Sequence, residues 1–271
     1  MKVRIISAIV LLLIFVPLLI IGGLPFSLLM VAISLVGLRE IFKVKKKQRE
    51  VPVLMELFGY LVVSFLTLNN YSSSDLVFTI DYRIVAGMIF AFLLPIVFIN
   101  DDKKYSVDDA LFMMGATLFI GISMNLLTLI RNFSLLYIIY IFLITIMTDT
   151  FALVTGRFIG KHKFAPKISP KKTWEGFFGG ALMGTVIGGV FFNTVIDPSV
   201  NLALILFVTL VLSIIGQLGD LVFSAIKRHY GEKDFSNLIP GHGGVLDRLD
   251  STIFVVLGFL LFLVILWWME S

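Results

Sequence analysis

The chain has 271 residues, of which 58% are hydrophobic and 15% are charged, and its formal net charge is +4. Its mean hydropathy of +1.01 excludes a soluble globular domain, because a chain of this length could not bury so much apolar surface. The lack of cysteine excludes disulfides, thiolate catalysis and cysteine-based zinc sites, and three scattered histidines do not suggest a histidine metal site. The predicted fold class is therefore an all-α, polytopic helical membrane protein.

Nine apolar runs have about the length that a helix needs to cross a bilayer, roughly 20 residues. The predicted spans are 5–22, 24–41, 53–69, 84–100, 110–130, 135–157, 175–196, 202–224 and 249–269. The first run is predicted to stay attached, since it is long for a signal peptide and no Ala-x-Ala-like site follows it. Gly22 and Gly23 are predicted to form a tight turn between the first two spans, and residues 70–83 a polar loop.

Lysine and arginine are concentrated in alternate loops between these spans. If the N-terminus lies in the cytoplasm, all of the 22 cations except Arg83 and Arg131 fall on the cytoplasmic side, which is the distribution typical of membrane proteins. The chain is therefore predicted to have a cytoplasmic N-terminus and a C-terminus outside. The same bias explains a sequence pI near 9.2 better than nucleic-acid binding does.

The predicted spans divide into two regions. Residues 1–109 hold spans one to four with their loops, and residues 110–271 form a C-terminal catalytic region with spans five to nine. In the seventh span, glycines recur every four residues, which exposes backbone on one face and lets another helix approach closely. They are Gly176, Gly180, Gly184 and Gly188. Internal packing is the preferred interpretation, and a contact between subunits is the alternative.

The eighth span carries polar residues in steps of three and four, so they share one face of a helix. They are Ser213, Gln217, Asp220, Ser224 and Lys227. Asp220 lies about 8 residues, or roughly 12 Å, from the helix end marked by Arg228. A carboxylate at that depth costs on the order of 3 kcal/mol unless it is paired or hydrated. A metal ligand in a wet cavity open to the cytoplasm is the preferred interpretation, and an ion pair with a neighbouring lysine is the alternative.

Residues 224–250 join the last two spans and contain eight charged side chains around a glycine-rich turn at 240–244. Asp247 and Asp250 are three residues apart, so in a helix they share a face and could join Asp220 in binding Mg²⁺ through oxygen atoms. Their alternative role is to cap the ninth helix. The turn permits close approach of backbone to an anion, and His242 is as suitable for fixing the loop as for contacting phosphate.

A second cytoplasmic segment, 161–176, precedes the seventh span and is rich in hydrogen-bond donors. Because helix N-termini bind phosphate, these donors are predicted to contact substrate phosphates. The set is Lys167, Ser169, Lys171, Lys172 and Thr173. The alternative is the ordinary excess of cations in cytoplasmic loops. Asp149, in the sixth span, is a further intramembrane acid that could contribute to the same cavity.

The spacing of these residues resembles the signature of phosphatidate cytidylyltransferases, also called CDP-diacylglycerol synthases. The matching pattern is Ser224-x-x-Lys227-Arg228-x4-Lys233-Asp234-x-Ser236-x2-Ile239-Pro240-x-His242-Gly243-Gly244-x2-Asp247-Arg248-x-Asp250. The segment Ser169-Pro-Lys-Lys-Thr-Trp-Glu-Gly176 is likewise typical of that family. The signature is long and specific, and the multi-span background fits over the whole chain.

The resemblance implies transfer of the cytidylyl group of CTP to phosphatidate, which gives CDP-diacylglycerol and pyrophosphate for phospholipid biosynthesis. It implies Mg²⁺ as the cofactor and allows a second cation, monovalent or divalent. It also implies a homodimer with no nucleic-acid partner, embedded as a multi-pass protein in a bacterial inner membrane, with its active site facing the cytoplasm.

Roles are assigned to the residues of these segments as hypotheses. The predicted catalytic residues are Asp220, Lys227, Arg228 and Asp247, and the predicted metal ligands are Asp220, Asp247 and Asp250. The predicted substrate-binding residues are Lys167, Ser169, Lys171, Lys172, Thr173, Lys233, His242, Gly243, Gly244 and Arg248. Two of these predictions have simple alternatives, since Lys227 and Arg228 also suit interfacial anchors and Lys233 also suits a solvated pair with Asp234.

Two other functions are compatible with the same features. A CTP-dependent lipid kinase would direct attack to the γ-phosphorus, and α-labelled CTP would then leave no label in the lipid. A secondary transporter is also compatible, because intramembrane acids mark transport paths. Transport predicts broken helices in two related halves, whereas the polar residues here are concentrated in the C-terminal half and on one side.

Overall fold

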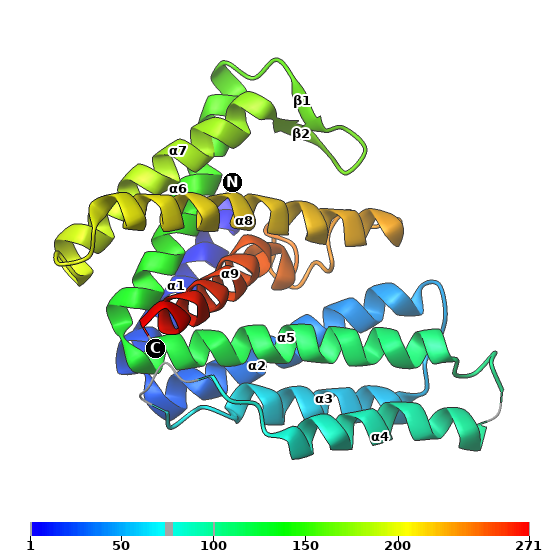
Figure 1. The fold of residues 1–271 in the computed structure, drawn as a ribbon. Helices are drawn as coiled ribbons and strands as arrows, with labels where there is room; N and C mark the ends of the chain where they lie inside the picture. Colours follow the sequence, from blue (N-terminus) through cyan, green and yellow to red (C-terminus); the bar gives the residue numbers. More distant parts are fainter. Residues whose placement is uncertain (1, 74–77, 100, 271) are drawn as a thin grey trace. The chain divides into compact units, whose positions relative to one another are not determined.

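The structure, a computed structural model, describes residues 2–73, 78–99 and 101–270 (Figure 1). Nine α-helices occur within these residues, one for each predicted span. They are α1 Lys2–Ile21, α2 Gly23–Lys46, α3 Val53–Leu68, α4 Tyr82–Ile99, α5 Val107–Phe133, α6 Leu135–Phe158, α7 Trp174–Phe191, α8 Leu202–His229 and α9 Leu246–Glu270. A π-helical turn, η1 Phe192–Ile196, extends α7, and two short strands, β1 Lys163–Ala165 and β2 Ser169–Thr173, precede it.

The helices confirm the prediction of an all-α, polytopic membrane protein. Seven helices of the described chain are long and apolar enough to cross a membrane, whereas α3 has only 16 residues. The predicted polar loop 70–83 lies between α3 and α4, although its residues 74–77 lie outside the described part. The orientation of the termini stays a prediction.

Several predicted spans are shorter than the helices that contain them, and three of these differences concern site residues or their neighbours. The second helix continues to Lys46, the eighth continues to His229, and the ninth already begins at Leu246. Each predicted span ends where its apolar run ends. α2 and α8 continue past that point because the helix dipole stabilises basic side chains in their last turns. α9 begins earlier because the dipole stabilises an acidic side chain, Asp247, in its first turn. Lys227, Asp247 and Asp250 are therefore all helical residues.

By packing, the chain forms two compact units. The first comprises Met1–Phe133 with Tyr230–Arg248, and the second comprises Ser134–His229 with Leu249–Ser271. The predicted division into 1–109 and 110–271 concerns where the catalytic residues lie, and it stays a prediction. The two units are described separately below.

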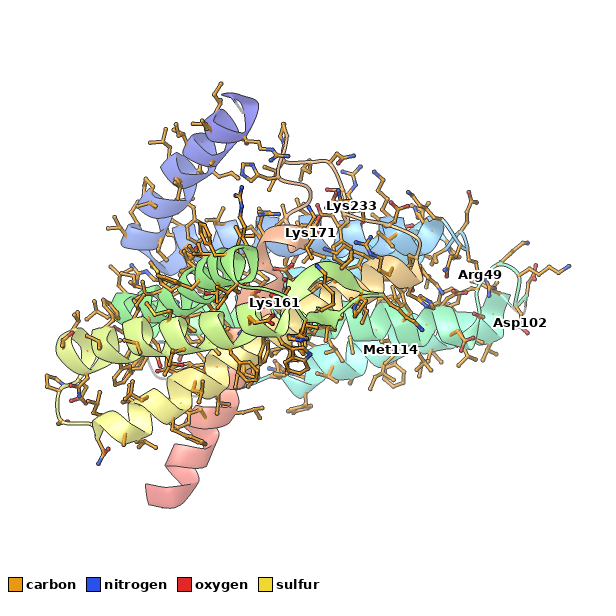
Figure 2. The ribbon with its side chains drawn as sticks, turned by 90° about the horizontal axis from the view of Figure 1, so that it is seen from above. Arg49, Asp102, Met114, Lys161, Lys171 and Lys233 are labelled. Atoms are coloured by element: carbon orange, nitrogen blue, oxygen red, sulfur yellow. The ribbon has the colours of Figure 1, made fainter. Side chains whose placement is uncertain are left out.

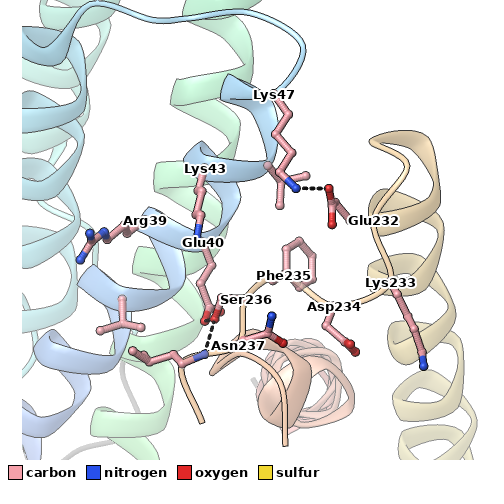
Figure 3. A pocket seen from close by; sticks show the side chains of 13 residues that line it. Arg39, Glu40, Lys43, Lys47, Glu232, Lys233, Asp234, Phe235, Ser236 and Asn237 are labelled. Atoms are coloured by element: carbon pink, nitrogen blue, oxygen red, sulfur yellow. Dashed lines mark hydrogen bonds and ion pairs between the residues drawn. The ribbon is translucent and has the colours of Figure 1, made fainter. Parts of the chain in front are cut away.

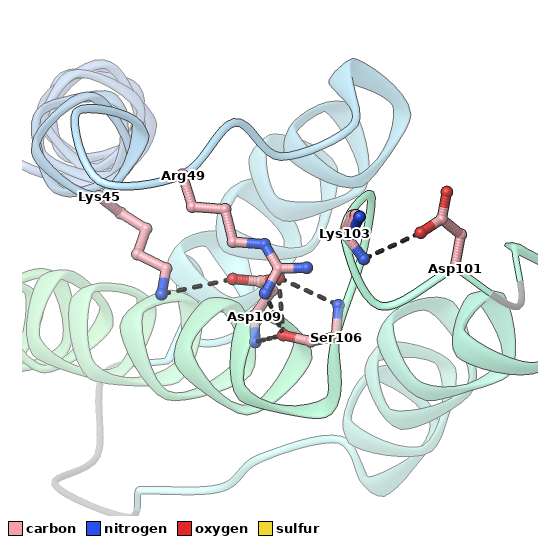
Figure 4. Close-up of polar contacts among 6 residues, drawn as sticks. All are labelled: Lys45, Arg49, Asp101, Lys103, Ser106 and Asp109. Carbon is pink, nitrogen blue, oxygen red and sulfur yellow. Dashed lines mark hydrogen bonds and ion pairs between the residues drawn. The ribbon is translucent and has the colours of Figure 1, made fainter.

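In the first unit, α3, α4 and α5 lie side by side, and α2 packs against α3 and α5 (Figure 1). The start of α5 is held by a buried carboxylate, Asp109. Its Oδ2 accepts hydrogen bonds from the backbone N and the Oγ of Ser106, at 3.0 and 2.8 Å, and this is the reciprocal capping of a helix N-terminus (Figure 4). Lys45 and Arg49 approach the same carboxylate to 3.3 and 3.2 Å, so they tie the end of α2 to α5.

The tight turn predicted at Gly22 and Gly23 is confirmed, since both glycines have positive φ, 69° and 55°. Arg131 donates from Nη2 to the carbonyl of Ile20 at 2.6 Å and from Nε to the carbonyl of Leu19. A cation at these last carbonyls of α1 caps the helix. Arg131 is one of the two cations that the predicted topology places outside, and this contact explains its presence there.

In the second unit, α7 packs against α6 and α8 through the glycines of the seventh span. A Cβ added at Gly176 would lie 2.6 Å from the carbonyl oxygen of Ala152, and one at Gly180 would lie 2.6 Å from that of Thr148. At Gly188 it would meet Ile144 of α6 and Thr209 of α8, both at 2.9 Å. The interpretation of this stripe as internal packing is confirmed.

Gly180→Ala is expected to destabilise the second unit, because the added methyl group would press on backbone atoms of α6 that cannot move aside cheaply. Such overpacking costs about 1–3 kcal/mol. The matched control is Gly115→Ala in α5, where an added Cβ meets nothing within 4 Å. Thermal unfolding in detergent should show a lower midpoint for Gly180→Ala and an unchanged or higher one for Gly115→Ala. Equal midpoints would contradict the close packing of α6 and α7.

Candidate active site

The polar face predicted on α8 is buried inside the protein. Ser213, Gln217, Ser224 and Lys227 are between 0% and 9% exposed. Ser213 Oγ shares a 2.6 Å hydrogen bond with Thr148 Oγ1 of α6, and Gln217 Nε2 donates to the carbonyl of Phe177 of α7 at 3.1 Å. This face of the helix is therefore directed at protein rather than at lipid.

Asp220 is the carboxylate of that face, and it is paired with Lys172 of β2. Lys172 Nζ lies 2.7 Å from Asp220 Oδ2 and donates to the carbonyl of Gln217 at 3.1 Å. Ser224 Oγ donates to the other oxygen, Oδ1, at 3.3 Å. The ion pair that the sequence offered as an alternative is thus present. Both side chains are still about a quarter exposed, 26% and 28%, so the pair is not fully enclosed by the protein.

A two-stranded hairpin brings Lys172 to α8, and the sequence reasoning missed it. β1 and β2 pair antiparallel, with Lys163 opposite Thr173 and Ala165 opposite Ser169. Side chains alternate along a strand, and consequently Lys171 (labelled in Figure 2) is exposed on this hairpin. Lys172, the next residue, is directed at Asp220 of α8. Arg228 steadies the hairpin from α8 by donating from Nε to the carbonyl of Ile168 at 3.2 Å.

Thr173 ends the hairpin and begins α7. Its Oγ1 accepts a hydrogen bond from Gly176 N at 3.1 Å, and the residue is 5% exposed. This is N-capping of a helix by a threonine. The hydroxyl that is predicted to contact substrate therefore has a structural partner. A threonine directly before the seventh apolar run, where helices prefer a capping residue, was the available signal.

Further acids belong to the same unit. Asp250 of α9 interacts electrostatically with Asp220, with Lys227 and with Asp149 of α6. Three carboxylates from three helices and the ammonium groups of Lys172 and Lys227 thus form one charged group. Asp149 also lines a small hollow whose other walls include Thr148, Ser213 and Ser251. The sequence offers Asp149 as a further acid of the same cavity, and this position is consistent with that role.

No group of three or more acidic, histidine or cysteine side chains among the described residues is spaced as a ready-made metal site. Mg²⁺ in proteins is commonly held by one or two carboxylates together with substrate phosphates and water. Asp220 and Asp250 are hard oxygen donors that interact with each other, so their chemistry fits that manner of binding.

The glycine-rich turn lies in the first unit. Gly241 and Gly243 have φ of 79° and 86°, and Ile239 N donates to the carbonyl of Gly243 at 2.8 Å, which closes the turn. His242 Nδ1 lies 3.0 Å from Ser7 Oγ of α1. This contact favours the loop-fixing role for the histidine.

Asp247 also holds this loop. Its Oδ2 accepts from Phe235 N at 2.9 Å and from Gly244 N at 2.8 Å, and the residue is 7% exposed. The carboxylate therefore orders the segment before α9, a role that includes the predicted alternative of capping. Its role as a metal ligand stays a prediction.

The other predicted site residues differ in exposure. Lys227 is 7% exposed, whereas Lys233 and Arg248 of the first unit and Lys167 of the hairpin turn are exposed, and Ser169 is half-buried. Lys233 lines an open pocket of about 690 Å³ between α2 and residues 232–238 (Figures 2 and 3). The pocket also contains Glu40, a buried carboxylate that the sequence reasoning did not select.

Comparison with known proteins places these features in a family. A family model described as Cytidylyltransferase family matches residues 2–266. The phosphatidate cytidylyltransferase of Staphylococcus haemolyticus is 39% identical over 257 residues, which cover 94% of this chain and 96% of the relative. That of Staphylococcus epidermidis is 39% identical, and that of Staphylococcus aureus is 37% identical, over the same shares.

The fold and these matches define a membrane-embedded enzyme of the nucleotidyltransferase class. The chain belongs to the cytidylyltransferase family, and the resemblance to phosphatidate cytidylyltransferases drawn from its signature is confirmed.

Lys172→Met is expected to destabilise the protein, because it leaves Asp220 in a membrane helix without its closest cation. The pair is partly exposed, so the expected loss is modest, about 1 kcal/mol. The matched control is Lys163→Met on the partner strand, whose side chain is exposed. Thermal unfolding in detergent should show a lower midpoint for Lys172→Met than for Lys163→Met. Identical midpoints would show that the pair contributes nothing to folding.

Proposed function

We propose that this protein transfers the cytidylyl group of CTP to phosphatidate, with CDP-diacylglycerol and pyrophosphate as products. Membership of the cytidylyltransferase family and the names of the Staphylococcus relatives support this reaction. The charged group of the second unit is the observation that supports particular residues for this reaction. In it, Asp220 is paired with Lys172, and Asp250 interacts with Asp220 and Lys227.

In the proposed reaction, a phosphate oxygen of phosphatidate attacks the α-phosphorus of CTP. A new P–O bond forms, the bond between the α-phosphorus and its bridging oxygen breaks, and pyrophosphate leaves with that electron pair. The second pKa of a phosphomonoester is about 6, so the attacking oxygen is already largely ionised near neutral pH. No strong general base is required, and positioning with charge neutralisation supplies the catalysis.

The cations of the second unit suit the neutralising role. Lys172 and Lys227 are directed into the protein, and Arg228 and Lys171 lie on or beside the hairpin. Their positive charge would offset the triphosphate and the lipid phosphate as these approach. Because Lys172 already contacts Asp220, an arriving phosphate would compete with the carboxylate for the ammonium group.

Mg²⁺ would be held by Asp220 and Asp250, with Asp247 as the further ligand that the sequence predicts. When bound, the metal would neutralise charge on the phosphates and orient them. The proposal allows a second cation, monovalent or divalent. The carboxylates of the chain would also keep the neighbouring lysines oriented when no substrate is present.

The two substrates determine where in the cell the proposed reaction can take place. Phosphatidate stays in the leaflet while CTP arrives from water, so their phosphates must meet near an interface. The Staphylococcus relatives support a bacterial cell membrane. The excess of lysine and arginine on one side supports a site that faces the cytoplasm. A homodimer is proposed from the family resemblance alone.

The first test uses purified wild-type protein with phosphatidate and CTP labelled at the α-phosphorus. Label is expected in the lipid product, and label at the γ-phosphorus is expected in pyrophosphate. Lipid labelled only from the γ-phosphorus would contradict cytidylyl transfer and establish a lipid kinase.

Asp220→Asn tests the site in the same assay. Activity is expected to fall by about 100-fold or more, since a metal ion supplies several kcal/mol of charge stabilisation in such reactions. The matched control is Asp102→Asn, an exposed acid of the first unit (Figure 2). Full Mg²⁺-dependent activity in a folded Asp220→Asn protein would remove this residue from the proposed site.

A further inference from the structure

Glu40 of α2 is a buried carboxylate with three hydrogen-bond donors around it. The residue is 3% exposed. Its Oε1 accepts from Ser236 Oγ at 2.5 Å (Figure 3). The same oxygen accepts from Val245 N at 2.9 Å, and Oε2 accepts from Leu246 N at 2.9 Å. One side chain of α2 thus holds both ends of the loop that carries the glycine-rich turn.

The contact with Val245 and Leu246 is a helix cap supplied from another helix. The first backbone N–H groups of any helix lack partners within the helix. Gly243, Gly244 and Val245, which precede α9, offer no serine, threonine, aspartate or asparagine side chain for this purpose. Glu40 takes that role and also places a negative charge at the positive end of the helix dipole. The direction of the first turn of α9 is therefore set by α2.

Gly244 is enclosed by this arrangement. Its N–H is taken by Asp247 Oδ2, and a Cβ added at Gly244 would lie 2.5 Å from Glu40 Oε1. The backbone of Gly244 does not have positive φ. The need for glycine here comes from the Glu40 carboxylate and not from backbone conformation.

We infer that Glu40 is a positioning residue of the proposed cytidylyl transfer. It acts through the segment from Ser236 to Asp247 and makes no contact with the reacting atoms in this role. By holding Ser236 and the first turn of α9, it fixes the orientation of His242, Gly243 and Asp247. The first two are predicted substrate-binding residues and the third is a predicted catalytic residue. This inference rests on the proposed function.

Glu40→Gln is the conservative test. Glutamine has nearly the same shape and can accept hydrogen bonds at its amide oxygen, but its NH2 group would face a hydrogen-bond donor where the second carboxylate oxygen now accepts. The expected result is a kcat lower by about 10-fold, the effect of one lost charged hydrogen bond. The matched control is Glu50→Gln, an exposed carboxylate in the same unit, with wild-type kcat expected. The wild-type arm must first yield CDP-diacylglycerol. If it does not, the proposed function fails, whereas equal kcat for both variants and the wild type overturns the positioning role alone.

A spectroscopic readout distinguishes positioning from a general loss of stability. The chain has no cysteine, so Asn237→Cys accepts one nitroxide label within the loop, and Lys103→Cys accepts one in another exposed loop of the same unit. Glu40→Gln is expected to sharpen the electron paramagnetic resonance lines of the label at 237 and to leave those at 103 unchanged. Increased mobility at 237 with wild-type kcat would make Glu40 a purely structural residue and would overturn the inference.

A double-mutant cycle tests the contact with Gly244 directly. Gly244→Ala alone is expected to lower kcat by at least about 10-fold, because the methyl group displaces the carboxylate. In a Glu40→Ala background, which leaves room for the methyl group, the same change should cost less than about threefold, as expected for residues in direct contact. Effects that simply multiply would contradict the assigned contact.

Discussion

A carboxylate within an apolar membrane helix is the constraint on which the second unit depends. Asp220 lies in a helix whose other positions are mostly hydrophobic, and a charge there is costly unless a partner or water compensates it. Lys172 supplies that partner from a strand rather than from another membrane helix. The hairpin, the threonine that caps α7 and the close packing of α6 with α7 all serve to hold one ammonium group beside one carboxylate. The pair is only partly enclosed, and in the proposed reaction it would exchange its internal contacts for phosphate and a cation.

The first unit uses carboxylates in a different way. Glu40 and Asp247 accept hydrogen bonds from backbone amides of the segment that carries the glycine-rich turn. Buried acids are costly unless their oxygens are hydrogen-bonded, and these two satisfy the requirement with main-chain donors. Ordering a glycine-rich loop costs much conformational entropy, and these hydrogen bonds offset part of that cost. The signature of the family therefore contains residues that shape the loop as well as residues that suit substrate.

Much of the fold was predictable from the sequence because apolar length and periodicity decide where membrane helices form. The nine helices of the described residues, the turn at Gly22 and the polar face of α8 all follow from such local patterns. The hairpin did not, since β2 contains Pro170 and two lysines and is ordered by its docking on α8. Glu40 was missed for a related reason: its partners Val245 and Leu246 are about 200 residues away in sequence, and no local pattern marks a helix cap supplied from elsewhere. The helix ends were misplaced because hydropathy reports the membrane core and not the end of the helix.

The most direct test of the central claim is an exchange of the two charges, with Lys172→Asp and Asp220→Lys made singly and together. An ion pair needs only opposite charges, whereas a site for a cation and phosphate needs the carboxylate on α8. The account predicts that the double variant recovers thermal stability relative to either single variant while cytidylyl transfer stays lost. Recovery of activity together with stability would contradict it, because the pair would then be a structural brace and nothing more.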